Sequence, residues 1–147
     1  FRAPRPPEPW TGVRDASTFG PVPPQQRTFV NLVGAGRHTP MGEACLSVNV
    51  VAPTAPGPPR PVMVWIYGGA FSMGSSAMPG YAGQALVRSG DVVYVSFNYR
   101  LGALGFIDVS RYATPERPLD SNLGIRDQVA AYALPSRSTR PVPRPTV

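Results

Sequence analysis

The sequence predicts an α/β fold built around a mostly parallel β-sheet. Two runs, residues 62–67 and 92–99, are apolar and rich in β-branched and aromatic residues, which is typical of strands buried on both faces. Between them, residues 83–88 suit a short helix that ends at Ser89 and Gly90. A strand, a helix and a second strand in this order form a βαβ unit, which closes right-handed and makes its two strands parallel.

The part of the chain before this unit predicts two further strands and three irregular stretches. Residues 1–27 are punctuated by proline and predict an irregular segment that wraps the domain. A short strand is expected at residues 31–33, followed by a polar loop over residues 34–42. Residues 46–52 alternate between apolar and polar side chains and predict a strand, and the turn-rich loop 53–61 then reverses the chain.

The C-terminal part predicts one helix and then changes character. Ser121-Asn122 provides a cap for a helix that runs to about residue 134. Residues 135–147 contain four prolines, three arginines and no acidic residue, so they cannot extend a helix or form a buried strand. We therefore divide the chain into a partial domain, residues 1–131, and a divergent, disordered tail, residues 132–147.

Composition excludes several classes of function. The net charge is +6, but the arginines are scattered singly and no basic patch is interleaved with aromatic residues, so we expect no nucleic-acid partner. No apolar run approaches the ~20 residues that a membrane-spanning helix needs. Cys45 is the only cysteine, so no intrachain disulfide can form, and we expect it to be a small buried hydrophobe.

Five motifs, in one order along the chain, resemble the type B carboxylesterase family, which includes the cholinesterases. The family has Trp-Ile-(His or Tyr)-Gly-Gly-(Gly or Ala)-Phe at the end of one core strand and Asn-Tyr-Arg at the end of the next. The motifs in this sequence are the proline-rich segment 4–21, Glu43-Ala44-Cys45-Leu46, Trp65-Ile66-Tyr67-Gly68-Gly69-Ala70-Phe71, Asn98-Tyr99-Arg100 and Asn122-Leu123-Gly124-Ile125-Arg126-Asp127-Gln128.

The resemblance implies the N-terminal strands and first helices of an α/β-hydrolase fold. It also implies hydrolysis of a small-molecule carboxylic ester by a Ser-Glu-His triad, with no cofactor and no metal. By the family's motif, the backbone N–H groups of Gly69 and Ala70 are two donors of the oxyanion hole, which forms in the loop after the third strand of this fold. The alternative is that Gly68 and Gly69 only make a tight turn between strand and helix.

The sequence contains no Gly-x-Ser-x-Gly segment for a nucleophile. The nearest imitation centres on Ser72, which has Ala70 in place of the first glycine and lies within the oxyanion loop itself, so we expect an ordinary loop serine. His38 is the only histidine and precedes every other site motif, whereas the triad of this fold follows the order serine, acid, histidine. We therefore expect a polar loop residue at position 38.

Several motif residues are expected to have structural roles. The family pairs the glutamate of its second motif with the arginine of Asn-Tyr-Arg, which implies an ion pair between Glu43 and Arg100. Tyr67 either lines the active-site gorge or packs in the core. Asn122 and Asp127 are expected at the start of a helix or in its packing. Trp65 and Tyr99 are expected in the core.

With nucleophile, acid and base all absent, we expect these residues alone to be inactive and, because both core strands lack neighbours, to aggregate. A reading-frame slip near residue 132 would explain the tail. Two alternatives remain open: a non-catalytic binding or adhesion-type member of the same fold, and a non-functional relic. A proline-rich adaptor, suggested by the P-x-x-P segments within residues 4–9, would not need two buried strands.

Overall fold

The computed structural model describes residues 1–27 and 39–133 of the chain. The strand expected at residues 31–33 and the single histidine, His38, lie outside these residues, and so does the tail from residue 134 onward.

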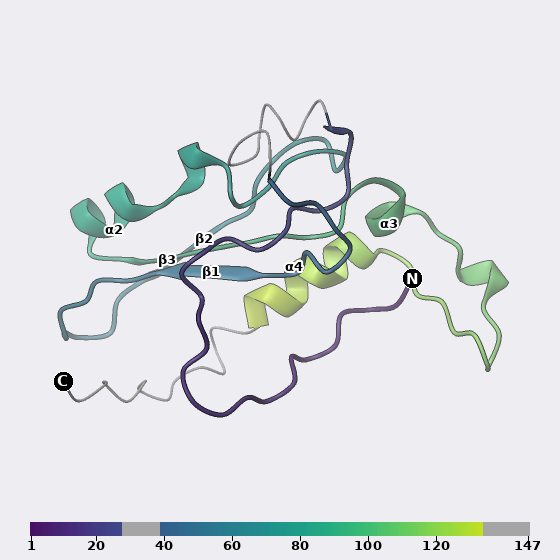
Figure 1. The fold of residues 1–147 in the computed structure, drawn as a ribbon, viewed down its shortest axis with the longest axis horizontal. Coiled ribbons are helices and arrows are strands. Elements are labelled where there is room, and N and C mark those ends of the chain that lie inside the picture. The colour runs from purple at the N-terminus through teal and green to yellow at the C-terminus, as the bar shows by residue number, and fades with distance from the viewer. Residues whose placement is uncertain (28–38, 134–147) are drawn as a thin grey trace.

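Three strands form a mixed sheet in the order β1-β3-β2 (Figure 1). They are β1 (Val48–Val51), β2 (Val62–Trp65) and β3 (Val93–Phe97). β2 and β3 run parallel, with Val64 opposite Val95, whereas β1 runs antiparallel to β3. The predicted βαβ unit is therefore confirmed, and its second strand lies at the centre of the described sheet.

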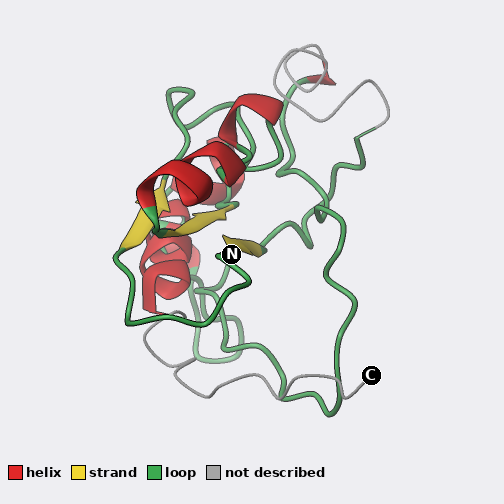
Figure 2. Ribbon diagram, turned by 90° about the vertical axis from the view of Figure 1, so that its left-hand side faces the viewer, coloured by secondary structure: helices red, strands yellow, loops and turns green. Residues whose placement is uncertain are grey.

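The described residues contain three helices, of which the sequence predicts the first and the last. α2 (Gln84–Gly90) connects β2 to β3, α3 (Gly102–Phe106) follows β3 directly, and α4 (Leu123–Ala133) packs against α3. Single turns of 3-10 helix occupy Pro79–Tyr81 and Ser110–Tyr112. Figure 1 shows α2 and α4 on opposite sides of the strands, and Figure 2 shows the strands lying between helices, as an α/β architecture requires.

The core lies between the end of β3 and helix α4. Its fully or almost fully buried members come from β3, from the residues just after it, from the end of β2 and from α4: Tyr67, Phe97, Tyr99, Leu101 and Ala131. The aromatic rings of Tyr67 and Tyr99 stack with centroids 4.5 Å apart. The Tyr99 hydroxyl donates to the Tyr67 carbonyl (2.8 Å), and the Tyr67 hydroxyl donates to the Tyr99 carbonyl (3.2 Å). Tyr67 is thus a core residue, one of the two roles that the sequence left open.

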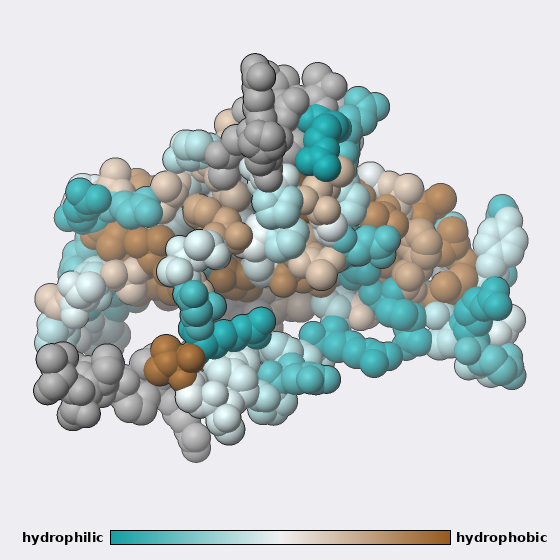
Figure 3. Space-filling model, viewed as in Figure 1, coloured by the Kyte–Doolittle hydropathy of each residue, from teal (hydrophilic) through white to brown (hydrophobic). Residues whose placement is uncertain are grey.

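Burial of β2 differs from the prediction. β3 is almost completely buried, but Val62 is 52% exposed, Trp65 39% and Ile66 50%. The reason is topological: among the described residues β2 has a strand on one side only, so it forms an edge. The expectation that Trp65 lies in the core is therefore wrong for this structure. Figure 3 shows apolar residues exposed over the sheet and α2 at the left of the view.

The N-terminal segment follows an irregular path outside the layered part, as the sequence predicts (Figure 2). Backbone contacts tie it to the rest of the chain near both of its ends. Val22 forms a bridge to Met41, with its N–H donating to the Pro40 carbonyl (2.9 Å). Further upstream, the Asp120 N–H donates to the Phe1 carbonyl (3.0 Å). None of the helices in the described ranges has the length and apolar character needed to cross a membrane.

Candidate active-site loop

The segment after β2, residues 68–74, is named here the glycine loop, and its backbone conformation is unusual. Gly69 has φ 140°, and a Cβ at this position would lie 2.0 Å from the Met73 carbonyl oxygen, so only glycine fits. The two following residues, Ala70 (φ 50°) and Phe71 (φ 59°), adopt left-handed conformations although they are not glycines. Such residues cost about 1–3 kcal/mol each and persist only where the surrounding structure holds them.

The turn of the glycine loop is closed around one carbonyl group. The Gly69 oxygen accepts hydrogen bonds from the N–H groups of Ser72 (3.0 Å) and Met73 (3.1 Å) and from the Ser72 hydroxyl (3.2 Å). Because a trans peptide is planar, with its C=O and N–H on opposite sides, the Ala70 N–H points away from the turn. Neither the Gly69 N–H nor the Ala70 N–H donates to any group in the described residues, so both are available to a ligand.

Ser72 is therefore a residue of the turn itself, with its hydroxyl directed at the Gly69 carbonyl. This contact agrees with the prediction of a loop serine.

Two contacts hold the glycine loop to the rest of the fold. The Gly102 N–H, at the start of α3, donates to the Phe71 carbonyl (2.7 Å), and the Phe71 ring lies 4.7 Å from that of Phe106. At the other end, the Gln25 side chain accepts from the Gly74 N–H and donates to the Gly74 carbonyl, both at 2.9 Å. Periodicity does not predict this role of Gln25, because the residue lies in an irregular segment.

A buried polar network supports the segment that follows the loop. The Asn98 amide oxygen accepts from the Ser76 N–H (2.9 Å) and hydroxyl (3.0 Å), and its NH₂ group donates to the Pro21 carbonyl (3.1 Å). Asn49 of β1 donates to the Ser76 hydroxyl (2.9 Å). Asn98 is the first residue of the Asn-Tyr-Arg motif, so the signal was in the sequence. Buried amides of this kind are retained where every donor and acceptor is satisfied.

Arg100 has a different partner from the one that the sequence implied. Its Nε and Nη2 groups donate to the two carboxylate oxygens of Asp127 in α4 (2.7 and 2.6 Å), and its backbone N–H also donates to that carboxylate (3.0 Å). The bond to Asp127 raises the pKa of the Arg100 guanidinium. The remaining Nη1 group donates to the Arg2 carbonyl (3.0 Å).

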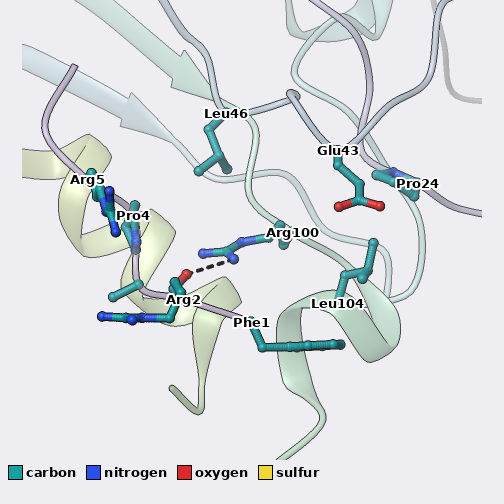
Figure 4. A pocket seen from close by; sticks show the side chains of 10 residues that line it. Phe1, Arg2, Pro4, Arg5, Pro24, Glu43, Leu46, Arg100 and Leu104 are labelled. Atoms are coloured by element: carbon teal, nitrogen blue, oxygen red, sulfur yellow. Dashed lines mark hydrogen bonds between the residues drawn. The ribbon is translucent and has the colours of Figure 1, made fainter. Parts of the chain in front are cut away.

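The predicted Glu43–Arg100 ion pair is therefore wrong for this structure, because the guanidinium pairs with Asp127 and donates its Nη1 group to the Arg2 carbonyl. Figure 4 shows Glu43 and Arg100 at the same depression, of about 360 Å³, with the guanidinium pointing away from Glu43 and toward Arg2. Asp127 was expected to be a residue of the helix start or of its packing. In the structure it is the buried carboxylate that binds Arg100.

Cys45 is completely buried and unpaired, as predicted. Burial raises the pKa of its thiol to about 11, so the group is neutral at ordinary pH. Within residues 1–27 and 39–133, no cluster of three or more His, Cys, Asp or Glu side chains is arranged to hold a metal ion.

Comparison with known proteins gives one family. The model of the Carboxylesterase family matches residues 1–134. The para-nitrobenzyl esterase of Bacillus subtilis is 42% identical over 134 residues, covering 89% of this chain and 26% of that protein. The acetylcholinesterase of Gallus gallus is 39% identical over 134 residues, covering 87% of this chain and 17% of that protein.

Solved structures agree with the sequence comparison. A thermophilic PNB esterase superposes with a TM-score of 0.79 at 45% identity, covering 89% of this chain and 26% of its own. The Geobacillus stearothermophilus carboxylesterase EST55 gives a TM-score of 0.74 at 41% identity, with 89% and 25% coverage. The chain thus spans about a quarter of the length of these relatives, and it shares their fold over that quarter.

Proposed function

Because the chain belongs to the carboxylesterase family, we propose that its glycine loop forms part of the oxyanion hole of a carboxylic ester hydrolase that uses a serine nucleophile. The substrate is a small-molecule carboxylic ester, and no cofactor takes part. The observation that carries this proposal is the pair of unengaged N–H groups, on Gly69 and Ala70, at the carboxyl end of a parallel strand. Ligands of open α/β sheets bind at that end of the strands.

The chemistry requires such donors. When a nucleophile attacks an ester carbonyl, the oxygen of that carbonyl becomes negatively charged, and fixed N–H groups about 2.7–3.1 Å away stabilise the charge. The donors of the glycine loop are already oriented by the closed turn around the Gly69 oxygen, so little reorganisation accompanies the reaction. Loss of one donor of this kind costs about 2.7–4 kcal/mol of barrier.

We further propose that these 147 residues do not hydrolyse esters by themselves. They contain no Gly-x-Ser-x-Gly segment, and their one histidine precedes all the other motifs. In this proposal the attacking serine and its base are supplied by groups outside these 147 residues, and the chain contributes the N–H donors.

A chimera tests the proposal. The aligned segment of the Bacillus subtilis para-nitrobenzyl esterase is replaced by residues 1–134 of this chain, the part that the family model matches, and hydrolysis of a para-nitrobenzyl ester is measured. We expect turnover, and we expect Gly69→Ala to lower kcat by about 10²–10³-fold because its methyl group would collide with the Met73 carbonyl and displace the loop. Gly80→Ala is the matched control, since no atom lies within 4 Å of the added Cβ.

Two results would contradict the proposal. An active chimera that is indifferent to Gly69→Ala would show that the loop is only a turn. A folded chimera without turnover would favour a non-catalytic binding member of the family or a relic.

A further inference from the structure

We propose that Gln25 is a positioning residue of the oxyanion hole: its side-chain amide fixes the peptide planes of the glycine loop and thereby the directions of the Gly69 and Ala70 N–H groups. This inference rests on the proposed function. Gln25 lies in the irregular N-terminal segment, 49 residues before the residue that it holds.

The contact between Gln25 and the loop is a reciprocal pair. The Oε1 atom of Gln25 accepts from the Gly74 N–H at 2.9 Å, and its Nε2 group donates to the Gly74 carbonyl at 2.9 Å. Nε2 also donates to the Pro23 carbonyl (3.0 Å), which holds the amide in place from its own segment. The side chain therefore binds the backbone of Gly74 much as a neighbouring strand would.

The first consequence concerns the peptide between Met73 and Gly74. Since the Gly74 N–H is directed at Gln25, the Met73 carbonyl of the same planar peptide points the opposite way. That carbonyl meets Gly69, where a Cβ would lie only 2.0 Å from its oxygen. Gln25 therefore fixes the orientation of the Met73 carbonyl, against which Gly69 packs.

The second consequence concerns the peptide between Gly68 and Gly69. A Cβ on Gly74 would lie 2.8 Å from the Gly68 oxygen and 2.5 Å from the Tyr67 ring, so the Gly68 carbonyl faces Gly74. The Gly69 N–H, on the opposite side of that peptide, is directed away from Gly74. The Ala70 N–H is also directed away from the turn, because the Gly69 carbonyl is bound by the Ser72 and Met73 N–H groups.

Both donors thus face away from residues 72–74, which close the turn, and Gln25 holds the last of those residues. The left-handed conformations of Ala70 and Phe71 make such support necessary, because strained backbone relaxes when its surroundings no longer determine it. The Gly102–Phe71 bond holds the middle of the loop, but it does not restrain residues 73 and 74.

The test compares Gln25 with its neighbour Gln26, which is exposed and makes no hydrogen bond to the residues that the structure describes. The variants Gln25→Ala and Gln26→Ala are made in the 147-residue chain and in the active chimera. In the chain, amide hydrogen exchange at low protein concentration should be about tenfold faster at Gly74 in Gln25→Ala than in Gln26→Ala. In the chimera, Gln25→Ala should lower kcat by about 10–100-fold and change KM by less than about twofold, because a small misplacement of positioned groups acts on the transition state.

Gln25→Glu supplies a readout that a purely structural role would not change. A protonated carboxyl group keeps one acceptor and one donor for the backbone of Gly74, whereas a carboxylate can only accept and would oppose the Gly74 carbonyl. The ratio of kcat between Gln25→Glu and Gln26→Glu should therefore rise as the pH falls from about 8 to about 5, toward the ordinary glutamate pKa of about 4.3. Taking the ratio cancels the pH dependence of the triad itself.

The outcomes are distinct. Unchanged exchange at Gly74 in Gln25→Ala overturns the inference, and so does unchanged kcat in an active chimera. If the wild-type chimera has no turnover while exchange at Gly74 still depends on Gln25, the proposed function has failed and the positioning role fails with it. Faster exchange, a kcat effect without a KM effect and recovery of Gln25→Glu at low pH together support the inference.

Discussion

The strands β2 and β3 are neighbours in one sheet and have similar apolar sequences, but they differ in burial. β3 has a strand on each side and is buried from Tyr94 to Phe97, whereas β2 is exposed at Val62, Met63 and Trp65. Their tails differ in the same way. The tail of β3 carries Arg100, whose Nε, Nη1 and Nη2 groups all donate hydrogen bonds, and the tail of β2 carries two N–H groups that bind no group in the described residues.

The two strands show that the same apolar sequence pattern can form either a buried central strand or an exposed edge strand. An apolar run specifies a strand, but burial depends on what lies beside that strand, and in the described residues β2 has a neighbouring strand on one side only. The described residues therefore contain a buried region centred on β3 and an exposed region around β2. In the exposed region, apolar side chains and two backbone N–H groups can still bind other groups. Substitutions in the two regions should have unequal effects.

The largest effect is expected where the β3 tail is anchored. The Asp127 side chain is 1% exposed, and Asp127→Ala would leave the Arg100 guanidinium without its charge partner, so we expect a loss of about 3–5 kcal/mol in the free energy of unfolding. Asp120→Ala is the control, because Asp120 also pairs with arginines but its side chain is 28% exposed; its effect should be much smaller. Urea denaturation followed by circular dichroism measures both, and equal losses would contradict the distinction.

A medium effect is expected from the buried thiol next to the same anchor. Burial raises the pKa of Cys45 from 9.0 to about 11, so the fold favours the protonated form. The stabilisation is complete below pH 9 and is lost as the pH rises through about 11, for a total of about 2–3 kcal/mol. The free energy of unfolding should therefore fall more steeply between these two pH values in the wild type than in Cys45→Ala. Parallel curves for the two proteins would refute the assignment.

The smallest effect on stability is expected at the β2 edge. Met63→Lys places a charge on an exposed edge strand, where we expect a change of no more than about 0.5 kcal/mol in unfolding free energy. Self-association of the 147-residue chain should nevertheless decrease, because an uncharged apolar edge pairs readily with other chains. Leu86→Lys in α2, which is 43% exposed against 41% for Met63, should not have this effect. Sedimentation velocity distinguishes the two variants.

Much of this contrast was readable from the sequence, and some was not. Periodicity and turn residues located all three strands, α2 and α4, and the Gly68-Gly69 pair located the loop. The exposure of β2 was not predicted, because an apolar composition indicates that a strand favours burial but does not indicate which strands lie beside it. The partner of Arg100 was missed because the pairing with Glu43 was carried over from the family's motif, and only the fold brings Asp127, 27 residues away, against the guanidinium. Gln25 acts through a contact between distant irregular segments, which no local pattern encodes.

The stacked, reciprocally bonded pair of Tyr67 and Tyr99 has a consequence for synthesis on the ribosome. The two residues are 32 positions apart, and β3, which joins β1 to β2, is translated after both. At about 5–20 residues per second, about 2–6 s pass between the appearance of the first tyrosine and the second. During that interval the glycine loop is synthesised before β1 or β2 has its partner strand. The order of translation therefore leaves β1 and β2 unpaired until β3, which pairs with both, has been synthesised.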